Sequence, residues 1–137
     1  MTDFRAGSYD APRRRGAPTV LSGHSLDGEA VRVRFEAVTI VAAVKARCES
    51  CREFVVGGLE ALGDVAVVVV CAVAPDDDEW RGAVRDVLVS AQALAELEIW
   101  SAPFYVLVDP ATSTVLTEGS LFSPAQVARE IAGVLRA

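Results

Sequence analysis

Two cysteines three positions apart, Cys48 and Cys51, stand where an apolar stretch meets a segment with helical spacing. Residues 38–44 are apolar apart from one threonine and mostly β-branched, which is typical of a strand buried on both faces. A thiol at the first turn of a helix lies beside unpaired N–H groups, and these favour the reactive thiolate. At this spacing the two cysteines can also close a small disulfide ring. The sequence therefore predicts a redox-active pair at a strand-to-helix junction.

The remaining pattern predicts one α/β domain. We expect strands over 31–36, 38–44, 65–73, 104–108 and 114–118, a helix over about 49–62, a helix from 76–79 to about 91, a short helical piece over about 91–97, and a final helix. Gly57-Gly58 inside the first helix indicates a kink or a close contact. The final helix begins at Ser123-Pro124, and Gln126 completes a capping-box pattern. This order implies a central mixed sheet with helices on both faces. Residues 1–17 are expected to be a flexible leader and 18–137 the domain.

Composition limits the possible partners and compartments. The chain has 137 residues and a net charge of -6, which argues against nucleic acid as the main partner. Its longest apolar run, residues 65–74, is far shorter than the roughly 20 residues that span a bilayer. We see no signal-peptide pattern, so we expect a cytoplasmic protein. Three cysteines are too few for a disulfide scaffold, and Cys71 is expected to be a buried, inert residue of the strand over 65–73.

Three stretches of the chain resemble the thioredoxin-like superfamily. The first is the Cys48-x-x-Cys51 pair, and the second is Ser101-Ala-Pro103 before an apolar strand, where the family carries a cis-proline. The third comprises residues 16–18 and 25–29, which resemble the extra N-terminal β-hairpin of the TlpA-like, MauD-like and peroxiredoxin-like branches. This resemblance implies a thioredoxin-like fold, and it favours a TlpA-like or MauD-like thiol-disulfide oxidoreductase.

The resemblance also implies roles for individual residues. Cys48 would be the nucleophile and Cys51 the resolving thiol. A cis peptide is accessible chiefly to proline, and Pro103 would lie against the pair while the Ala102 backbone binds an extended substrate segment. Trp100 would lie at the edge of that substrate site. The expected partners are a protein substrate bearing a disulfide or thiol and an upstream redox protein, and the reaction needs no organic cofactor and no metal.

Departures from the family pattern keep other functions open. Arg47 replaces the tryptophan that precedes the first cysteine of thioredoxin, and Ala42 replaces its buried acid. Arg47 is nevertheless expected to contact substrate, beside Cys48. One alternative is a protein-binding module whose cysteines are idle. Another is a metal site, although the pair supplies two ligands where structural zinc takes four. Peroxide reduction would need threonine where Lys45 stands, and His24, the single histidine, is expected to be a loop residue.

Overall fold

The computed structural model describes residues 15–76, 78–80, 83 and 86–136. It contains a seven-stranded sheet with the order β2-β1-β5-β4-β3-β6-β7. The strands are β1 Val20–His24, β2 Ala30–Arg34, β3 Thr39–Val44, β4 Ala66–Cys71, β5 Val87–Val89, β6 Phe104–Asp109 and β7 Thr114–Ser120. The helices are α1 Glu49–Val56, the short 3-10 helix η2 Glu60–Leu62, α2 Ala91–Glu96 and α3 Pro124–Arg136. Strands β3, β4 and β5 are parallel, whereas β1, β2, β6 and β7 pair antiparallel, so the sheet is mixed as predicted.

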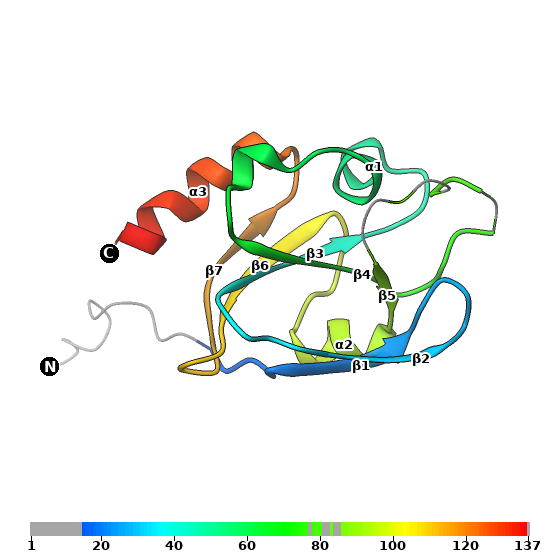
Figure 1. The fold of residues 1–137 in the computed structure, drawn as a ribbon, viewed down its shortest axis with the longest axis horizontal. Helices are drawn as coiled ribbons and strands as arrows, with labels where there is room; N and C mark the ends of the chain where they lie inside the picture. Colours follow the sequence, from blue (N-terminus) through cyan, green and yellow to red (C-terminus); the bar gives the residue numbers. More distant parts are fainter. Residues whose placement is uncertain (1–14, 77, 81–82, 84–85, 137) are drawn as a thin grey trace, which may run out of the picture.

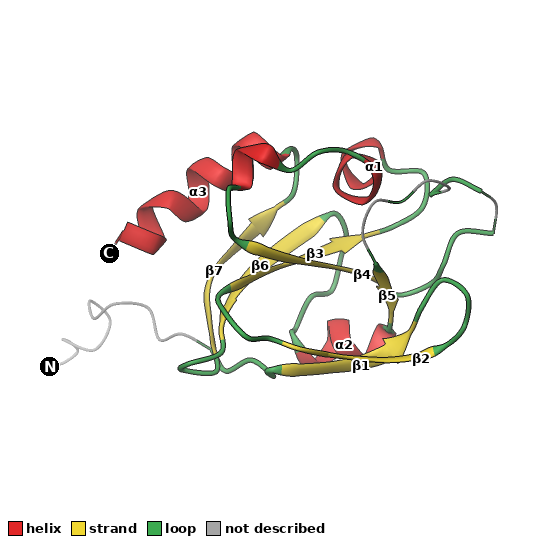
Figure 2. Ribbon diagram, viewed as in Figure 1, coloured by secondary structure: helices red, strands yellow, loops and turns green. Residues whose placement is uncertain are grey.

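Helices cover both faces of the sheet (Figures 1 and 2). Helices α1 and α3 lie along one face, and α2 lies against the other. The alternation of side chains along β3 explains this arrangement, because neighbouring residues of a strand point to opposite faces. Ile40 and Ala42 pack with Phe54 of α1 and Ile131 of α3. Val41 and Ala43 belong to a second cluster, which contains Ala93 of α2. All six residues of β3 are buried, as the sequence predicts.

The N-terminal hairpin that the resemblance implied is present. Strands β1 and β2 pair antiparallel, and the turn between them contains Gly28 at a φ of 90°. The hairpin joins the rest of the sheet where His24 pairs with Val89 of β5. Gly23 lies at this contact because a Cβ atom there would come within 2.5 Å of the Val89 carbonyl oxygen. The sequence pattern predicted the second strand of this hairpin but did not predict β1.

The predicted helix over 49–62 is wrong in its second half. Helix α1 ends at Val56, and Gly57, whose N–H still donates to the Glu53 carbonyl at 2.9 Å, has extended dihedrals. The two glycines end the helix because they gain little from helical backbone and adopt other conformations readily. Only η2 follows before β4.

The predicted helix from 76–79 to about 91 is also wrong where the structure describes it. Val87–Val89 forms strand β5, parallel to β4, and Ser90 then caps α2 through a bond from the Ala93 N–H. The spacing of Val87 and Leu88 is compatible with a helix. The β-branched residues of this segment favour a strand, however, and the edge of β4 is available for pairing. Residues 77, 81–82 and 84–85 of this segment lie outside the described residues. The short helical piece after it is confirmed as α2.

Two smaller expectations also have outcomes. Strand β4, which was expected to be fully buried, is so only in its second half, from Val69 to Cys71. Residues 1–14 of the expected leader lie outside the described residues, whereas Arg15 and Ala17 bond to the start of β7 and the turn before it. Among the described residues, no helix combines the length and apolar character that crossing a bilayer requires.

Candidate active site

The two cysteines of the predicted pair are joined by a disulfide at the first turn of α1. Cys48 is the N-cap residue, with extended dihedrals of -131° and 113°, and its Sγ accepts a hydrogen bond from the Cys51 N–H at 3.3 Å. A second contact joins Cys48 Sγ to the Ser50 hydroxyl at 3.5 Å. Cys48 is half-buried while Cys51 is fully buried. An incoming sulfur can therefore reach Cys48 more easily than Cys51.

The turn in front of Cys48 is held from two sides. The Lys45 backbone N–H donates to Cys51 Sγ at 3.4 Å, which links the end of β3 to the buried sulfur. Arg47 has a φ of 58°, in the left-handed region, and its N–H donates to Glu79 Oε2 at 2.6 Å. A carboxylate from a distant loop thus lies at the residue before the half-buried Cys48.

The proline segment lies beside the same end of the sheet. The Ala102–Pro103 peptide bond is cis, as the family resemblance implied. Pro103 directly precedes β6, whose first residue, Phe104, is paired with Ala43 of β3. Because β3 and β6 are antiparallel neighbours, Pro103 is placed close to the residues that lead into the Arg47 turn.

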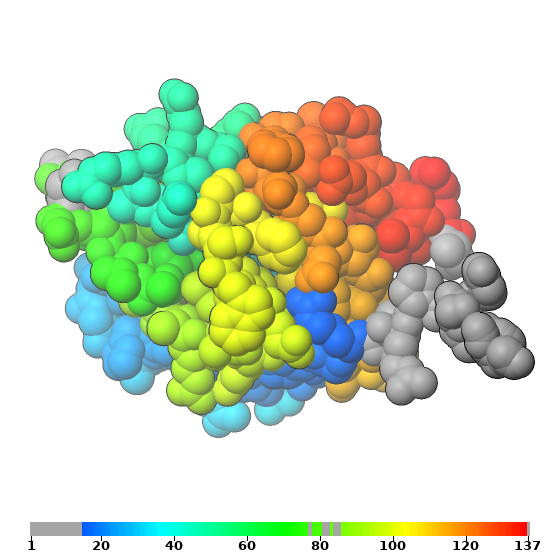
Figure 3. All heavy atoms as spheres, turned by 180° about the vertical axis from the view of Figure 1, so that it is seen from behind, coloured from blue at the N-terminus to red at the C-terminus, as the bar shows by residue number. Residues whose placement is uncertain are grey.

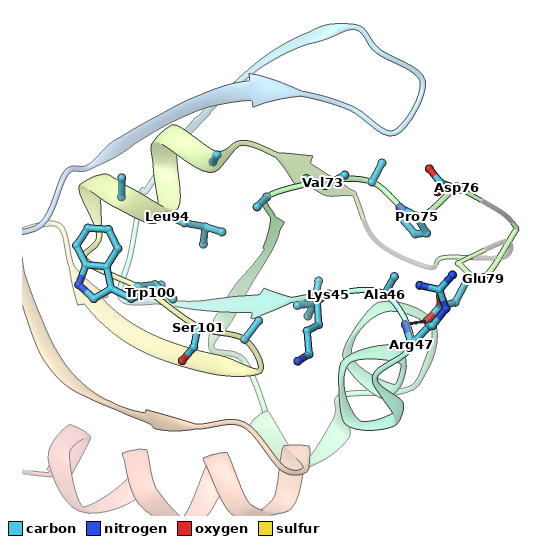
Figure 4. Close-up of a pocket in the computed structure, with 17 residues that line it drawn as sticks. Lys45, Ala46, Arg47, Val73, Pro75, Asp76, Glu79, Leu94, Trp100 and Ser101 are labelled. Carbon is cyan, nitrogen blue, oxygen red and sulfur yellow. Dashed lines mark hydrogen bonds between the residues drawn. The ribbon is translucent and has the colours of Figure 1, made fainter.

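A groove of about 550 Å³ opens beside this turn (Figure 4). Its walls come from four segments: the end of β3 and the following turn, the loop after β4, helix α2, and the segment before Pro103. The lining residues are Val44–Arg47, Ala72–Asp76, Glu79, Ala91, Leu94, Ala95 and Ile99–Ala102. Its volume falls in the range of small-ligand and peptide sites, about 300–1,000 Å³.

Large apolar side chains are exposed at the groove. Trp100 is 76% exposed and Val73 is 74% exposed, and both line it. Figure 3 shows, from behind, that the yellow segment before β6 and the green loop after β4 both reach the surface of this face. Exposed tryptophan and valine side chains at a concave surface are typical of an interaction site.

The structure brings together three of the four residues expected to bind substrate. Arg47, Trp100 and Ala102 line the groove, whereas Pro103 and the two cysteines do not. Cys48 and Pro103 directly follow lining residues in the sequence. Sequence reasoning missed Val73 and Glu79. Val73 was expected to be the last residue of a strand that in fact ends at Cys71, and Glu79 was assigned to the acidic start of a helix. Only the negative charge of the acidic run gave a signal.

The third cysteine and the histidine lie apart from this chemistry. Cys71 is fully buried in β4, as predicted, and burial raises the pKa of its thiol to about 11, which is consistent with an unreactive side chain. His24 is an exposed residue at the end of β1, not the loop residue that was expected, and it does not line the groove.

Solved structures share this architecture, although no family model and no curated protein sequence matches the chain. A DsbF homologue from Corynebacterium diphtheriae is 19% identical, with a TM-score of 0.62 over 93% of this chain and 89% of that one. A secreted thiol-disulfide isomerase from Corynebacterium glutamicum is 17% identical, with a TM-score of 0.63 over 94% and 90%. A thiol:disulfide interchange protein of the thioredoxin family from Chlorobium tepidum is 16% identical, with a TM-score of 0.60 over 92% and 99%. The chain therefore has the thioredoxin fold, with a disulfide at the first turn of α1 and a cis-proline before β6.

Proposed function

We propose that this protein is a thiol-disulfide oxidoreductase that acts on protein disulfides. One observation carries the proposal: a half-buried cysteine at a helix N-terminus is joined to a fully buried one, three residues on. That arrangement offers one sulfur to a partner and keeps the other in reserve. Two of the solved structures of the same fold are described as a thiol-disulfide isomerase and a thiol:disulfide interchange protein, which supports the same function.

The reduced pair transfers two electrons in two exchange steps. The Cys48 thiolate attacks one sulfur of the substrate disulfide, forming a mixed disulfide and releasing the other substrate sulfur as a thiolate. The Cys51 thiolate then attacks Cys48 Sγ, closes the Cys48–Cys51 disulfide and releases the second substrate sulfur. The substrate leaves as a dithiol and the protein is oxidised. The reverse sequence oxidises a dithiol substrate.

The groove supplies the contacts that hold the substrate segment near Cys48. An extended chain that reaches Cys48 passes the backbone of Ala102 beside the cis peptide bond, where strand-like hydrogen bonds would form. Its apolar side chains then rest against Trp100, and the Arg47 side chain lies at the rim. These contacts give the substrate-binding roles of Arg47, Trp100, Ala102 and Pro103.

The extra N-terminal hairpin favours the TlpA-like or MauD-like branch over thioredoxin itself. In that branch the protein receives its electrons from an upstream thiol protein. A cytoplasmic location stays a prediction from the sequence, and one of the proteins with this fold is described as secreted.

Replacing the resolving thiol tests the function directly. In Cys51→Ala the first exchange proceeds and the second cannot, so we expect a mixed disulfide between Cys48 and partner proteins. Non-reducing electrophoresis and mass spectrometry detect this adduct, and a reductant releases it. The double variant Cys48→Ala/Cys51→Ala is the matched control and forms none, and Cys71→Ala in the Cys51→Ala background leaves the adduct intact.

The idle binding module predicts the opposite result. It requires that no adduct forms with proteins or small disulfides, and that the double variant still binds its partner as the wild type does. Such a result would replace the proposed enzyme by a binding domain.

A further inference from the structure

The loop after β4 reaches the turn in front of Cys48 through one carboxylate. Glu79 Oε2 accepts the backbone N–H of Arg47 at 2.6 Å, although the two residues are 32 positions apart (Figure 4). Arg47 has a φ of 58°, a conformation that residues other than glycine seldom adopt. The bond therefore ties a disfavoured backbone position, one residue before the nucleophile, to a separate segment of the fold.

The same carboxylate brings a negative charge to the reacting sulfur. Standard backbone dimensions place Glu79 Oε2 within about 10 Å of Cys48 Sγ, which is about one Debye length at 0.1 M salt. The helix N-terminus favours a thiolate at this sulfur, and the carboxylate opposes it. Among the described residues, the charged side chains that lie near Arg47 or Glu79 in the sequence are Lys45, Glu49, Arg52, Asp76 and Asp78, besides Arg47 itself. These residues stay the same when Glu79 alone is changed.

We infer that Glu79 is a positioning residue that holds the Arg47 turn in front of Cys48 and, through its charge, disfavours the Cys48 thiolate. This inference rests on the proposed function. A thiolate stabilises the reduced form of a cysteine pair, so a charge that disfavours it makes the pair a stronger reductant. Glu79 thereby shifts the balance toward giving electrons to a substrate disulfide.

Glu79→Gln separates charge from contact, because the amide oxygen still accepts the Arg47 N–H. At low ionic strength we expect the pKa of Cys48, measured by the pH dependence of its alkylation in the reduced full-length protein, to fall by about 0.3 unit. An elementary charge at about 10 Å in a largely aqueous medium corresponds to roughly a twofold change. Above the thiol pKa, equilibration with glutathione should shift about twofold toward the reduced protein, or about 9 mV.

Two controls make the result specific. At 1 M salt the Debye length falls to about 3 Å, and the difference between Glu79→Gln and wild type should largely disappear. Asp64→Asn removes an equal charge just before β4, at the end of that strand away from Cys48, and should shift neither quantity.

An unchanged Cys48 pKa and an unchanged glutathione equilibrium in Glu79→Gln overturn the inference. This holds even if Glu79→Ala has lower exchange activity, because an effect seen only in Glu79→Ala reflects loss of the hydrogen bond to Arg47 and not loss of the charge. An equal shift in Asp64→Asn overturns it as well. If the wild type itself shows no reversible Cys48–Cys51 couple with glutathione, the proposed function fails instead, so the two failures are distinguishable.

Discussion

Three cysteines in one small domain have different environments, and those environments assign their chemistry. Cys48 caps a helix and is partly accessible, Cys51 is buried one turn along the same helix, and Cys71 is buried in β4. A thiol in an apolar interior is a poor nucleophile because the thiolate is costly to form there. Position in the fold, rather than residue type, therefore separates the reactive cysteine from the inert one.

Cys71 should resist alkylation in the folded protein. With its pKa raised to about 11, only about one molecule in a thousand carries the thiolate at pH 8. After reduction, iodoacetamide at pH 8 should label Cys48 first and Cys71 only after denaturant is added, as peptide mass spectrometry can measure. Cys71→Ala, labelled in parallel, identifies the slow site, and rapid native labelling of Cys71 would contradict its inert role.

The sequence was sufficient for residues whose chemistry is local and insufficient for those placed by distant contacts. The spacing of Cys48 and Cys51 marked them as a redox pair, and the family resemblance implied the cis-proline at Pro103. Glu79 was missed because its bond to Arg47 crosses 32 positions, and no local pattern records it. The same holds for Val73, whose exposure depends on where β4 ends.

Helix α3 is fixed by hydrogen bonds at its first turn and by one hydrogen bond to the sheet. Its first turn is a capping box: the Gln126 N–H donates to Ser123 Oγ at 3.1 Å, and the Ser123 N–H donates to Gln126 Oε1 at 3.2 Å. Further along, Glu130 accepts a hydrogen bond of 2.5 Å from the buried Tyr105 hydroxyl of β6. The cap was predictable because both partners lie within four residues, whereas the bond between helix and sheet was not.

The Tyr105–Glu130 bond should make stability depend on pH at both extremes. The hydrogen bond from Tyr105, followed by that from Gln126, lowers the pKa of Glu130, so its contribution is present above the ordinary glutamate pKa and is lost as pH falls through the lowered value. Burial, with the Glu130 bond, raises the pKa of Tyr105, so its contribution is present below about pH 10 and is lost at higher pH.

Tyr105→Phe tests this bond. We expect the free energy of unfolding at pH 7 to fall by about 1 kcal/mol, because one hydrogen bond is lost. In urea titrations the difference from wild type should shrink below about pH 4. Glu130→Gln is the matched control, since it keeps an acceptor and removes the acid-side titration. A difference that stays constant from pH 7 to pH 3 would show that the ionised carboxylate is not involved.

The elements that the sequence mispredicted share a physical cause. The helix at α1 was predicted too long because apolar residues continue at helical spacing past Gly57. Strand β5 was predicted as helix because the positions of Val87 and Leu88 are compatible with both helical and strand periodicity. The periodicity of a short apolar segment does not distinguish a strand from a helix. Residues 87–89 form a strand because they pair with β4, and α1 ends at Val56 because the glycines that follow readily adopt non-helical conformations.

At the scale of the whole molecule, the chain before β1 is tied to two distant parts of the domain. The Arg15 side chain pairs with Glu118 at 2.5 Å and donates to the Leu97 carbonyl oxygen at 2.8 Å. The Ala17 N–H donates to the Ser113 carbonyl at 2.8 Å. These contacts join the N-terminal segment, the end of α2 and the β6–β7 hairpin. We propose that Arg15 and Ala17 belong to the folded domain, ahead of the boundary expected at residue 18.

Shortened chains test that boundary. A chain starting at Pro18 lacks these contacts, and we expect its free energy of unfolding to be about 1–3 kcal/mol below that of a chain starting at Arg15. Thermal and urea unfolding measure the difference. Arg15→Ala in the longer chain removes only the side-chain bonds and should give an intermediate value. Equal stability of the two chains would return the boundary to residue 18.

The two tryptophans of this domain lie in contrasting surroundings. Trp80 is buried in the cluster that contains Cys51, and Trp100 stands exposed at the groove. A disulfide quenches the emission of a neighbouring indole, so reduction should brighten the short-wavelength fluorescence that comes from Trp80. The long-wavelength emission from Trp100 should change instead when a bound partner covers this side chain in the groove. One emission spectrum, recorded without any label, would then separate the redox state of the sulfurs from the occupancy of the groove.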